Sequence, residues 1–316
     1  MMDCFVGIDT SNYTTSAALC NAEGEVLANI KEPLPVREGE CGLRQSDAVF
    51  AHVRNLPTVM ERLKGELTGK RVLAVGCSTR PRDVEGSYMP CFLAGKAAAE
   101  SFAAALNLPV IPTSHQDGHI MAAVYSCGAG EDLLQTPFCA FHVSGGTTEV
   151  LHVRPQKNGF EVSLVGGTND LNAGQAIDRV GVMMGLRFPC GREMEALAAE
   201  WKGEIPPFRV SVKDGFCNLS GLQNLAEKLW KQTGDQSLVS AFVFAFLGKT
   251  LAKMTAALDE IYPGIPVVYA GGVMSNKKLQ GILAARKNTY FAEPQFSADN
   301  AAGVALLCRR QFLNLQ

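Results

Sequence analysis

The chain has 316 residues, and a chain of this length is expected to form two units of about 150 residues rather than one core. Its formal net charge of -2 at pH 7 excludes a strongly basic, histone-like binder of nucleic acid, although a local basic groove stays open. The ten cysteines include no C-x-x-C pair and indicate reduced thiols. Because there is no signal peptide and the longest apolar run covers only residues 238–247, we expect a cytoplasmic protein with no membrane partner.

The first third of the chain predicts three strands, followed by helices and strands in alternation. Apolar residues 5–9 end in an acid, hydroxyl residues dominate 10–16, and further strands are expected at 17–20 and 26–30. A helix should then run from a Ser46 cap to about residue 67 and carry His52. A buried strand at 71–77, an alanine-rich helix at 92–106 and a strand at 108–111 complete this part.

Two of the five histidines stand four residues apart directly after this part, in the segment SHQDGH of residues 114–119. Thr113 and Ser114 are good helix N-caps, and strong helix formers follow the second histidine. His115 and His119 should therefore project side by side from one helix, as metal ligands do. Two unrelated surface histidines are the alternative that this motif alone leaves open.

The second part of the chain repeats the opening pattern. A strand is expected at 138–143, a tight turn of small residues at 144–148, a returning strand at 149–153 and a third strand at 159–165. Helices should follow around 173–185, 193–202 and 236–261, then a strand at 266–270, a Gly-Gly turn, a short helix from Asn276 and a last helix after Asn300.

A strand, a Ser/Thr/Gly turn and a second strand occur at residues 8–19 and again at 142–153. This duplication predicts an α/β, actin-like (ASKHA) fold of two related lobes, residues 1–112 and 113–316, each with a mixed five-stranded sheet flanked by helices and with a cleft between them. Backbone N–H groups of the two turns would approach a phosphate chain, and Gly271 and Gly272 would form a third wall. Two ordinary β-hairpins are the alternative for either turn alone.

Several motifs also occur in the order and spacing of one protein family. They are GIDTS at residues 7–11, HQDGH at 115–119, VSGG at 143–146, AIDR at 176–179, PCG at 189–191, SGL at 220–222, AGGVMSN at 270–276 and DN at 299–300. Nearly end to end, the chain resembles the TsaD family, the transferase subunit that makes threonylcarbamoyladenosine in tRNA and was once labelled a glycoprotease. Gln116 argues against a zinc peptidase, because H-E-x-x-H enzymes have their general-base glutamate at that place.

The resemblance implies that His115, His119 and Asp299 bind one divalent metal. Two imidazoles and one carboxylate leave positions open on Fe(II) or Zn(II), where a substrate oxygen can coordinate. The sequence does not choose between these metals. It identifies no catalytic residue, and the transfer requires no nucleophilic triad.

The resemblance also implies a site for an adenine nucleotide or an acyl adenylate. The matching residues are His142, Val143, Ser144, Gly145, Gly146, Asp178, Gly191, Gly271, Gly272 and Asn276. Glycines admit close contact with a ligand, and an aspartate can accept hydrogen bonds from ribose hydroxyls. A surface charge on a helix is the alternative for Asp178, and a helix N-cap is the alternative for Asn276.

In the TsaD family the donor is a threonylcarbamoyl adenylate and the acceptor is the amine of an adenosine beside the anticodon. The resemblance therefore implies a metal-dependent acyl or carbamoyl transferase with the adenylate and tRNA as partners. A smaller paralogous actin-like subunit and an ATPase helper are the further partners that it implies. Two alternatives stay open: a paralogue that carbamoylates a different acceptor, such as a small molecule, and a non-catalytic nucleotide-binding partner.

The chain departs from the family pattern around these motifs. Asn12, Tyr13 and Thr14 stand in place of a Cys-Asp-Glu run, so two acids are lost. The other departures are Ser114 and Thr147 for histidines, Gln175 for a glutamate, Cys190 for a glycine and residues 78–82 for a Gly-Pro-Gly-rich loop. These departures favour a divergent paralogue and leave its acceptor open.

Overall fold

The computed structural model describes residues 1–35 and 43–315, and the chain divides into two compact units. Unit 1 comprises Met1–Ser126, Pro155–Glu161 and Gln295–Gln316, and unit 2 comprises Cys127–Arg154 and Val162–Pro294. This division differs from the expected boundary between residues 112 and 113. The reason is that the helix with the paired histidines packs on the C-terminal helix, and both pack with the first sheet.

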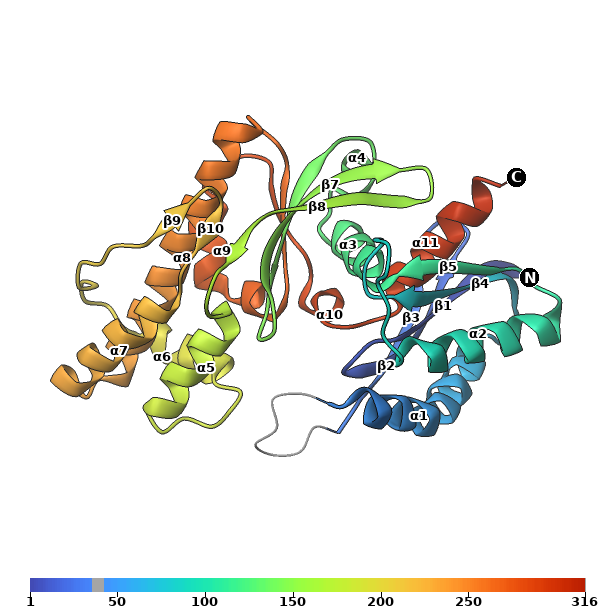
Figure 1. The fold of residues 1–316 in the computed structure, drawn as a ribbon, viewed down its shortest axis with the longest axis horizontal. Coiled ribbons are helices and arrows are strands. Elements are labelled where there is room, and N and C mark those ends of the chain that lie inside the picture. Colours follow the sequence, from blue (N-terminus) through green and yellow to red (C-terminus); the bar gives the residue numbers. More distant parts are fainter. Residues whose placement is uncertain (36–42, 316) are drawn as a thin grey trace. The chain divides into compact units, whose positions relative to one another are not determined.

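Unit 1 is a five-stranded mixed sheet with helices on both faces (Figure 1). Its elements are β1 (Met2–Thr10), β2 (Thr14–Asn21), β3 (Val26–Pro33), α1 (Gln45–Glu66), β4 (Lys70–Arg80), α2 (Phe92–Leu106), β5 (Val110–Ser114), α3 (His115–Ser126) and α11 (Ala302–Leu313). The strand order is β3-β2-β1-β4-β5; β1, β2 and β3 pair antiparallel, and β4 and β5 continue parallel to β1. The five strands agree with the expectation for this sheet.

Strand β1 alternates strictly between the two faces of this sheet. Cys4, Val6 and Ile8 belong to the core that α1 and α2 cover. The residues between them face α11, since Phe5 makes an edge-to-face ring contact with Phe312 of that helix. The same alternation places Asp9 on the α11 face of the sheet.

Glycines let α11 lie unusually close to its neighbours. A Cβ at Gly7 of β1 would overlap the backbone of Ala305, and one at Gly76 of β4 would lie 2.7 Å from the Cβ of Cys308. A Cβ at Gly303, in the first turn of α11, would overlap the carbonyl oxygen of Gly118 in α3. Backbones at this separation leave room only for hydrogen atoms.

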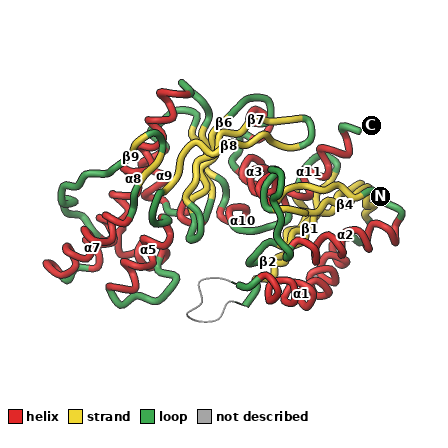
Figure 2. Tube along the Cα trace, viewed as in Figure 1, coloured by secondary structure: helices red, strands yellow, loops and turns green. Residues whose placement is uncertain are grey.

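Unit 2 is built on a seven-stranded sheet, in which helices α5 to α9 cover one face (Figure 2). Its elements are α4 (Gly130–Leu133), β6 (Phe138–Val143), β7 (Thr148–Gln156), β8 (Gly159–Thr168), α5 (Ala173–Met183), α6 (Gly191–Glu200), β9 (Val212–Lys213), β10 (Phe216–Cys217), α7 (Ser220–Thr233), α8 (Gln236–Ile261), β11 (Val267–Ala270), the 3-10 helix η1 (Gly272–Ser275), α9 (Lys277–Leu283) and β12 (Thr289–Phe291). The short helix α10 (Pro294–Ser297) leads from unit 2 back to unit 1.

The two sheets confirm the internal duplication. The order β8-β7-β6-β11-β12 in unit 2 repeats the order β3-β2-β1-β4-β5 of unit 1, strand for strand. The expected five strands are too few for unit 2, however, because β10 pairs with β8 and β9 pairs with β10 at that edge. Each of these added strands has two residues, too few for an alternation to be visible in the sequence.

Helix α8 is the core helix of unit 2, and it is longer than the apolar run at 238–247. It begins after an Asp235 cap, whose carboxylate accepts a hydrogen bond from the backbone N–H of Leu238 (3.0 Å), and it has 26 residues. By length and composition alone it could cross a membrane, but 67% of its most apolar window is buried inside the protein. Burial of this kind is typical of the central helix of a globular core.

The start of α1 and the presence of α7 depart from the expectation. Helix α1 begins at Gln45, after an Arg44 cap, so the expected cap at Ser46 is wrong and that residue lies in the first turn. Helix α7 was not expected, although Leu222, Ala226 and Leu229 are spaced for one apolar helical face and the first two are fully buried.

The close approach of α11 and α3 predicts that Gly303→Ala destabilises the protein by about 3 kcal/mol, at the upper end of overpacking costs. The added Cβ must push α11 away from Gly118. Gly65→Ala is the matched control, because a Cβ at that helical position of unit 1 meets no described heavy atom within 4 Å, and it should be neutral or stabilising by up to about 1 kcal/mol. Urea denaturation of both variants measures this difference, and equal midpoints would refute the packing argument.

Candidate functional site

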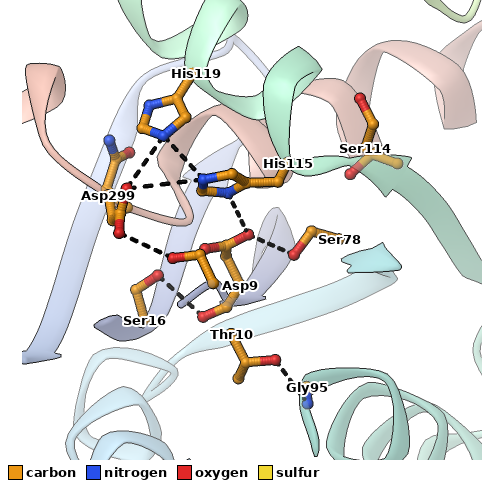
Figure 3. A network of polar contacts seen from close by, with 12 residues as sticks. Asp9, Thr10, Ser16, Ser78, Gly95, Ser114, His115, His119 and Asp299 are labelled. Carbon is orange, nitrogen blue, oxygen red and sulfur yellow. Dashed lines mark hydrogen bonds and ion pairs between the residues drawn. The ribbon is translucent and has the colours of Figure 1, made fainter. Parts of the chain in front are cut away.

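The paired histidines lie where the sequence predicts, in the first turns of α3. The expected Ser114 cap is confirmed, because its hydroxyl oxygen accepts a hydrogen bond from the backbone N–H of Asp117 (3.0 Å). His115 and His119 are four residues apart and therefore share one face of the helix. Their Nε2 atoms lie 3.0 Å apart (Figure 3).

Asp299 completes a group of three potential ligands within unit 1. It lies just before α11, and its Oδ1 is 3.2 Å from Nε2 of His119 and 3.7 Å from Nε2 of His115. The three side chains are 17–22% exposed, so a substrate atom can reach them. Oδ2 of Asp299 accepts a hydrogen bond from the Ser11 hydroxyl (3.0 Å), which leaves Oδ1 facing the histidines.

Asp9 forms a hydrogen bond with Nδ1 of His115, the ring nitrogen that faces away from His119 and Asp299. Its Oδ1 accepts a hydrogen bond from Nδ1–H of His115 (2.9 Å) and another from the Ser78 hydroxyl (Figure 3). A proton on Nδ1 fixes the tautomer, so Nε2 presents its lone pair toward His119 and Asp299 when the ring is neutral. Metal-bound histidines nearly always have such a carboxylate or carbonyl behind them.

The charges of the site are strongly coupled. Burial lowers the pKa of His115, but the charge and hydrogen bond of Asp9 outweigh burial, and with Asp299 they raise it to about 9. Burial also opposes ionisation of Asp9 and Asp299, yet the neighbouring histidines hold the pKa of both carboxyls below the ordinary aspartate value. The site therefore contains two ionised carboxylates, and Oδ2 of Asp9 has no hydrogen-bond partner in the described part of the chain.

These observations fit a divalent metal ion. Two ligand atoms that are each about 2.1 Å from one ion lie about 3.0–3.4 Å apart at bond angles of about 90–110°. Two of the three separations in the site, 3.0 and 3.2 Å, lie in this range, and the third is 3.7 Å. A divalent cation would take the place of the proton that the raised pKa of His115 keeps on its ring, and it would balance the negative charge of the two carboxylates. The donor set of two nitrogens and one oxygen suits Fe(II) and Zn(II) alike.

Sequence reasoning missed Asp9, Ser78 and Ser11 as members of this site. Asp9 is the acid that ends the first strand, and it lies 106 residues from His115 along the chain. The signal that could have found it is its polarity, because it follows an apolar strand and is completely buried. Its partner Ser78 follows from the parallel register of β1 and β4, in which Ile8 pairs with Cys77.

Eight of the ten candidate nucleotide residues lie in unit 2 at or just beyond the carboxyl ends of β6 and β11, and the other two, Asp178 and Gly191, lie in α5 and at the start of α6. His142 and Val143 end β6, and the turn after them is closed by hydrogen bonds from Ser144 N–H to the Thr147 carbonyl (2.7 Å) and from Thr147 N–H to the Ser144 hydroxyl (3.1 Å). The start of α5 packs on this turn, because a Cβ at Gly174 would lie 2.6 Å from the Cα of Gly145. Carboxyl ends of strands in open α/β sheets are common ligand sites.

The candidate glycines are of two kinds. A Cβ at Gly145, Gly146, Gly191 or Gly272 would meet no described heavy atom within 4 Å, so these backbones border open space. Gly271 has φ of 101°, and a Cβ there would overlap the carbonyl of Val143. Packing against β6 is therefore sufficient reason for glycine at position 271.

Asp178 and Asn276 both have local structural partners. Oδ1 of Asp178 accepts a hydrogen bond from the backbone N–H of Cys190 (2.8 Å), directly before Gly191. Oδ1 of Asn276 caps α9 by accepting a hydrogen bond from the N–H of Leu279 (3.0 Å). This is the helix N-cap that the sequence leaves open as the alternative role of Asn276. Its Nδ2 is buried, and the described residues offer it no hydrogen-bond partner, so this donor is available to a ligand.

Comparison with known proteins gives one family. A family model described as tRNA N6-adenosine threonylcarbamoyltransferase (TsaD) matches residues 26–306. The protein of that name from Streptococcus sanguinis (strain SK36) is 32% identical over 292 residues, which cover 89% of this chain and 83% of the relative. The one from Streptococcus pneumoniae serotype 2 (strain D39 / NCTC 7466) is 30% identical over 315 residues, which cover 95% and 90%.

Solved structures that are similar to this chain confirm the actin-like fold. Full-length HypF in its phosphate- and nucleotide-bound form has a TM-score of 0.60 at 12% identity, over 96% of this chain and 55% of that chain. The activator of 2-hydroxyisocaproyl-CoA dehydratase from Clostridium difficile, with bound ADPNP, has a TM-score of 0.52 at 15% identity, over 100% and 97%. At these identities the likeness concerns the fold alone.

The geometry predicts one divalent metal ion per chain. His115→Ala combined with His119→Ala should abolish stoichiometric binding, and Asp9→Asn should weaken affinity by about 10- to 100-fold, because the His115 ring loses the carboxylate that orients it. Asp3→Asn is the control on the same strand, since Asp3 pairs with Arg71 at the surface. Elemental analysis and Zn(II) titration measure these effects. Unchanged stoichiometry in the double variant would contradict the site.

Proposed function

Since this chain belongs to the family of tRNA N6-adenosine threonylcarbamoyltransferases, we propose that it is a metal-dependent transferase that moves a threonylcarbamoyl group from an adenylate to an adenosine of tRNA. The observation that carries the metal dependence is the convergence of His115, His119 and Asp299, with Asp9 behind the first histidine. The same set argues against a purely nucleotide-binding partner, which has no use for three convergent ligands.

His115 and His119 would hold the metal through Nε2, and Asp299 would hold it through Oδ1. A divalent ion in this place supplies a Lewis acid that polarises the carbonyl oxygen of the carbamoyl group. Asp9 keeps the proton on Nδ1 of His115, and Ser11 fixes the orientation of the Asp299 carboxylate. In the reaction the amine bonds to the carbamoyl carbon, the bond from that carbon to the adenylate oxygen breaks, AMP leaves and the amine loses a proton.

The adenylate part of the donor would bind in unit 2. The turn Ser144–Gly145–Gly146 borders open space and exposes backbone to a phosphate, as does Gly272. The free Nδ2 donor of Asn276 supports a contact with a ligand acceptor atom. Asp178, beside Gly191, is the candidate acceptor for ribose hydroxyls, although one of its oxygens already accepts from Cys190.

The relatives are named for action on tRNA, and we propose the same acceptor, in the cytoplasm. A smaller actin-like subunit and an ATPase helper are the proposed protein partners. The departures around Tyr13 and Thr147 favour the alternative in which the same donor chemistry carbamoylates a different acceptor.

Transfer is tested directly with zinc- or iron-loaded protein, threonylcarbamoyl adenylate and tRNA, followed by mass spectrometry of the digested nucleosides. We expect threonylcarbamoyladenosine with the wild type and with Asp3→Asn, and none above background with the His115→Ala, His119→Ala double variant, because the metal ligands are lost. A metal-loaded protein that consumes the adenylate without modifying tRNA would refute the tRNA assignment and favour the different acceptor.

A further prediction concerns the small-residue turn. Gly145→Val should weaken binding of AMP or the adenylate by at least about tenfold, because its side chain occupies space next to a phosphate. The melting temperature should change little, since the space at this Cβ is open. Gly281→Val, at an open position in helix α9 of unit 2, should leave binding intact. If Gly145→Val melts lower but binds normally in calorimetry, the turn is only a hairpin connection.

A further inference from the structure

His52 is a completely buried histidine outside the metal ligands, in the middle of α1. Its Nδ1 lies 2.8 Å from the Thr15 hydroxyl, and its Nε2 lies 2.7 Å from the backbone carbonyl oxygen of Ser11. In a neutral imidazole one ring nitrogen donates a hydrogen bond and the other accepts one. The partners of the two nitrogens therefore show which tautomer is present.

The partners of His52 determine its tautomer. A carbonyl oxygen can only accept, so Nε2 must carry the proton and donate it to Ser11. Burial lowers the pKa of His52 below the ordinary histidine value, and a neutral ring has only one N–H. Nδ1 therefore accepts from the Thr15 hydroxyl, which in turn accepts from Nδ2 of Asn55 (3.4 Å). The result is a directed chain of hydrogen bonds from α1 to the Ser11 carbonyl.

Ser11 is the residue through which this chain reaches the candidate metal centre. Its backbone carbonyl is held by His52, while its side-chain hydroxyl donates to Oδ2 of Asp299 (3.0 Å). A serine hydroxyl can point at Asp299 only if the backbone that carries it stays in place. Asp299 itself lies in the short segment between α10 and α11.

The residues on either side of Ser11 are also held by hydrogen bonds to other parts of unit 1. The Thr10 hydroxyl donates to the Cys91 carbonyl (3.0 Å) and accepts from the N–H of Gly95 in α2 (3.0 Å). The side-chain oxygen of Asn12 accepts from Nε2 of Gln45 at the start of α1 (2.7 Å). Thr10, Ser11 and Asn12 are thus each hydrogen-bonded to a helix or to its N-terminal cap, and His52 provides this contact at Ser11.

We propose that His52 is a positioning residue for the metal ligand Asp299: it fixes Ser11, whose hydroxyl holds Oδ2, so that Oδ1 faces His115 and His119. This inference rests on the proposed metal site. Without the hydrogen bond from His52 to Ser11, the Asp299 carboxylate can rotate, and the position of its Oδ1 relative to the two histidines becomes less well defined. The rival explanation is that His52 only fills the core between α1 and β2.

Two polar variants separate these explanations. In His52→Gln the side-chain amide reaches the place of Nε2 and can still donate to the Ser11 carbonyl, whereas in His52→Asn it reaches only the place of Nδ1. Both keep a buried amide, so they share the cost of substitution in the core. Ser11→Ala removes the final hydroxyl of the chain without disturbing α1.

The experiment is a titration of full-length protein with Co(II), followed by its visible absorption, with a thermal melt of each variant. We expect His52→Asn and Ser11→Ala each to weaken Co(II) binding by about tenfold and to alter the spectrum, while His52→Gln stays within about threefold of wild type. Combining His52→Asn with Ser11→Ala should give no further loss, since both act through one hydroxyl.

The outcomes are distinguishable. Wild-type affinity and spectrum in His52→Asn, or losses that multiply in the double variant, would overturn the positioning role while the metal site stands. Equal loss in His52→Gln and His52→Asn, in proportion to their lower melting temperatures, would show a core residue only. A wild-type protein that binds no Co(II) at all would overturn the proposed function, and this inference with it.

Discussion

The close packing of α11 on α3 and on the first sheet determines where the candidate ligands lie. Gly303 meets Gly118, which stands between the two histidines, while Gly7 and Gly76 bring β1 and β4 against the same helix. Asp299 precedes this helix, and Asp9 and Ser78 each lie two residues beyond one of the strand glycines. The separations within the site are therefore set by backbone contacts, which have little freedom to adjust. A helix from the end of the chain thereby becomes part of the first unit.

Electrostatics adds a second constraint on the same atoms. Asp9 is completely buried and Asp299 is largely buried, and both are held ionised by histidines. Isolated carboxylates in such a place would be costly, and a buried ion pair recovers that cost only with good geometry and further hydrogen bonds. Ser78 and Ser11 each donate one of these bonds. The polar network is therefore arranged around negative charge, which is the arrangement that a divalent cation stabilises.

The duplicated strand pattern and the histidine pair could be predicted because both are local signals: alternation, small-residue turns and an i, i+4 spacing. The role of Asp9 beside His115 could not be predicted from local signals. It depends on the register of β1 against β4 and on the position of α3, and no short segment of the sequence specifies either. Strands β9 and β10 were missed because two residues show no period. The boundary between residues 112 and 113 failed for a related reason, because no sequence signal indicates that the last helix returns to the first sheet.

The departures from the family pattern separate into two groups when their contacts are considered. Ser114 caps α3 through its hydroxyl, Gln175 completes a capping box with Asn172, and Thr147 closes its turn through backbone atoms alone. At these positions the local structure is maintained by the residue present. Tyr13 is different, because it is 45% exposed and puts a phenol where the family pattern has an acid. A phenol can stack on other rings and donate a hydrogen bond, whereas a carboxylate can only accept. The substitution therefore changes the chemistry of an exposed side chain in the turn between β1 and β2.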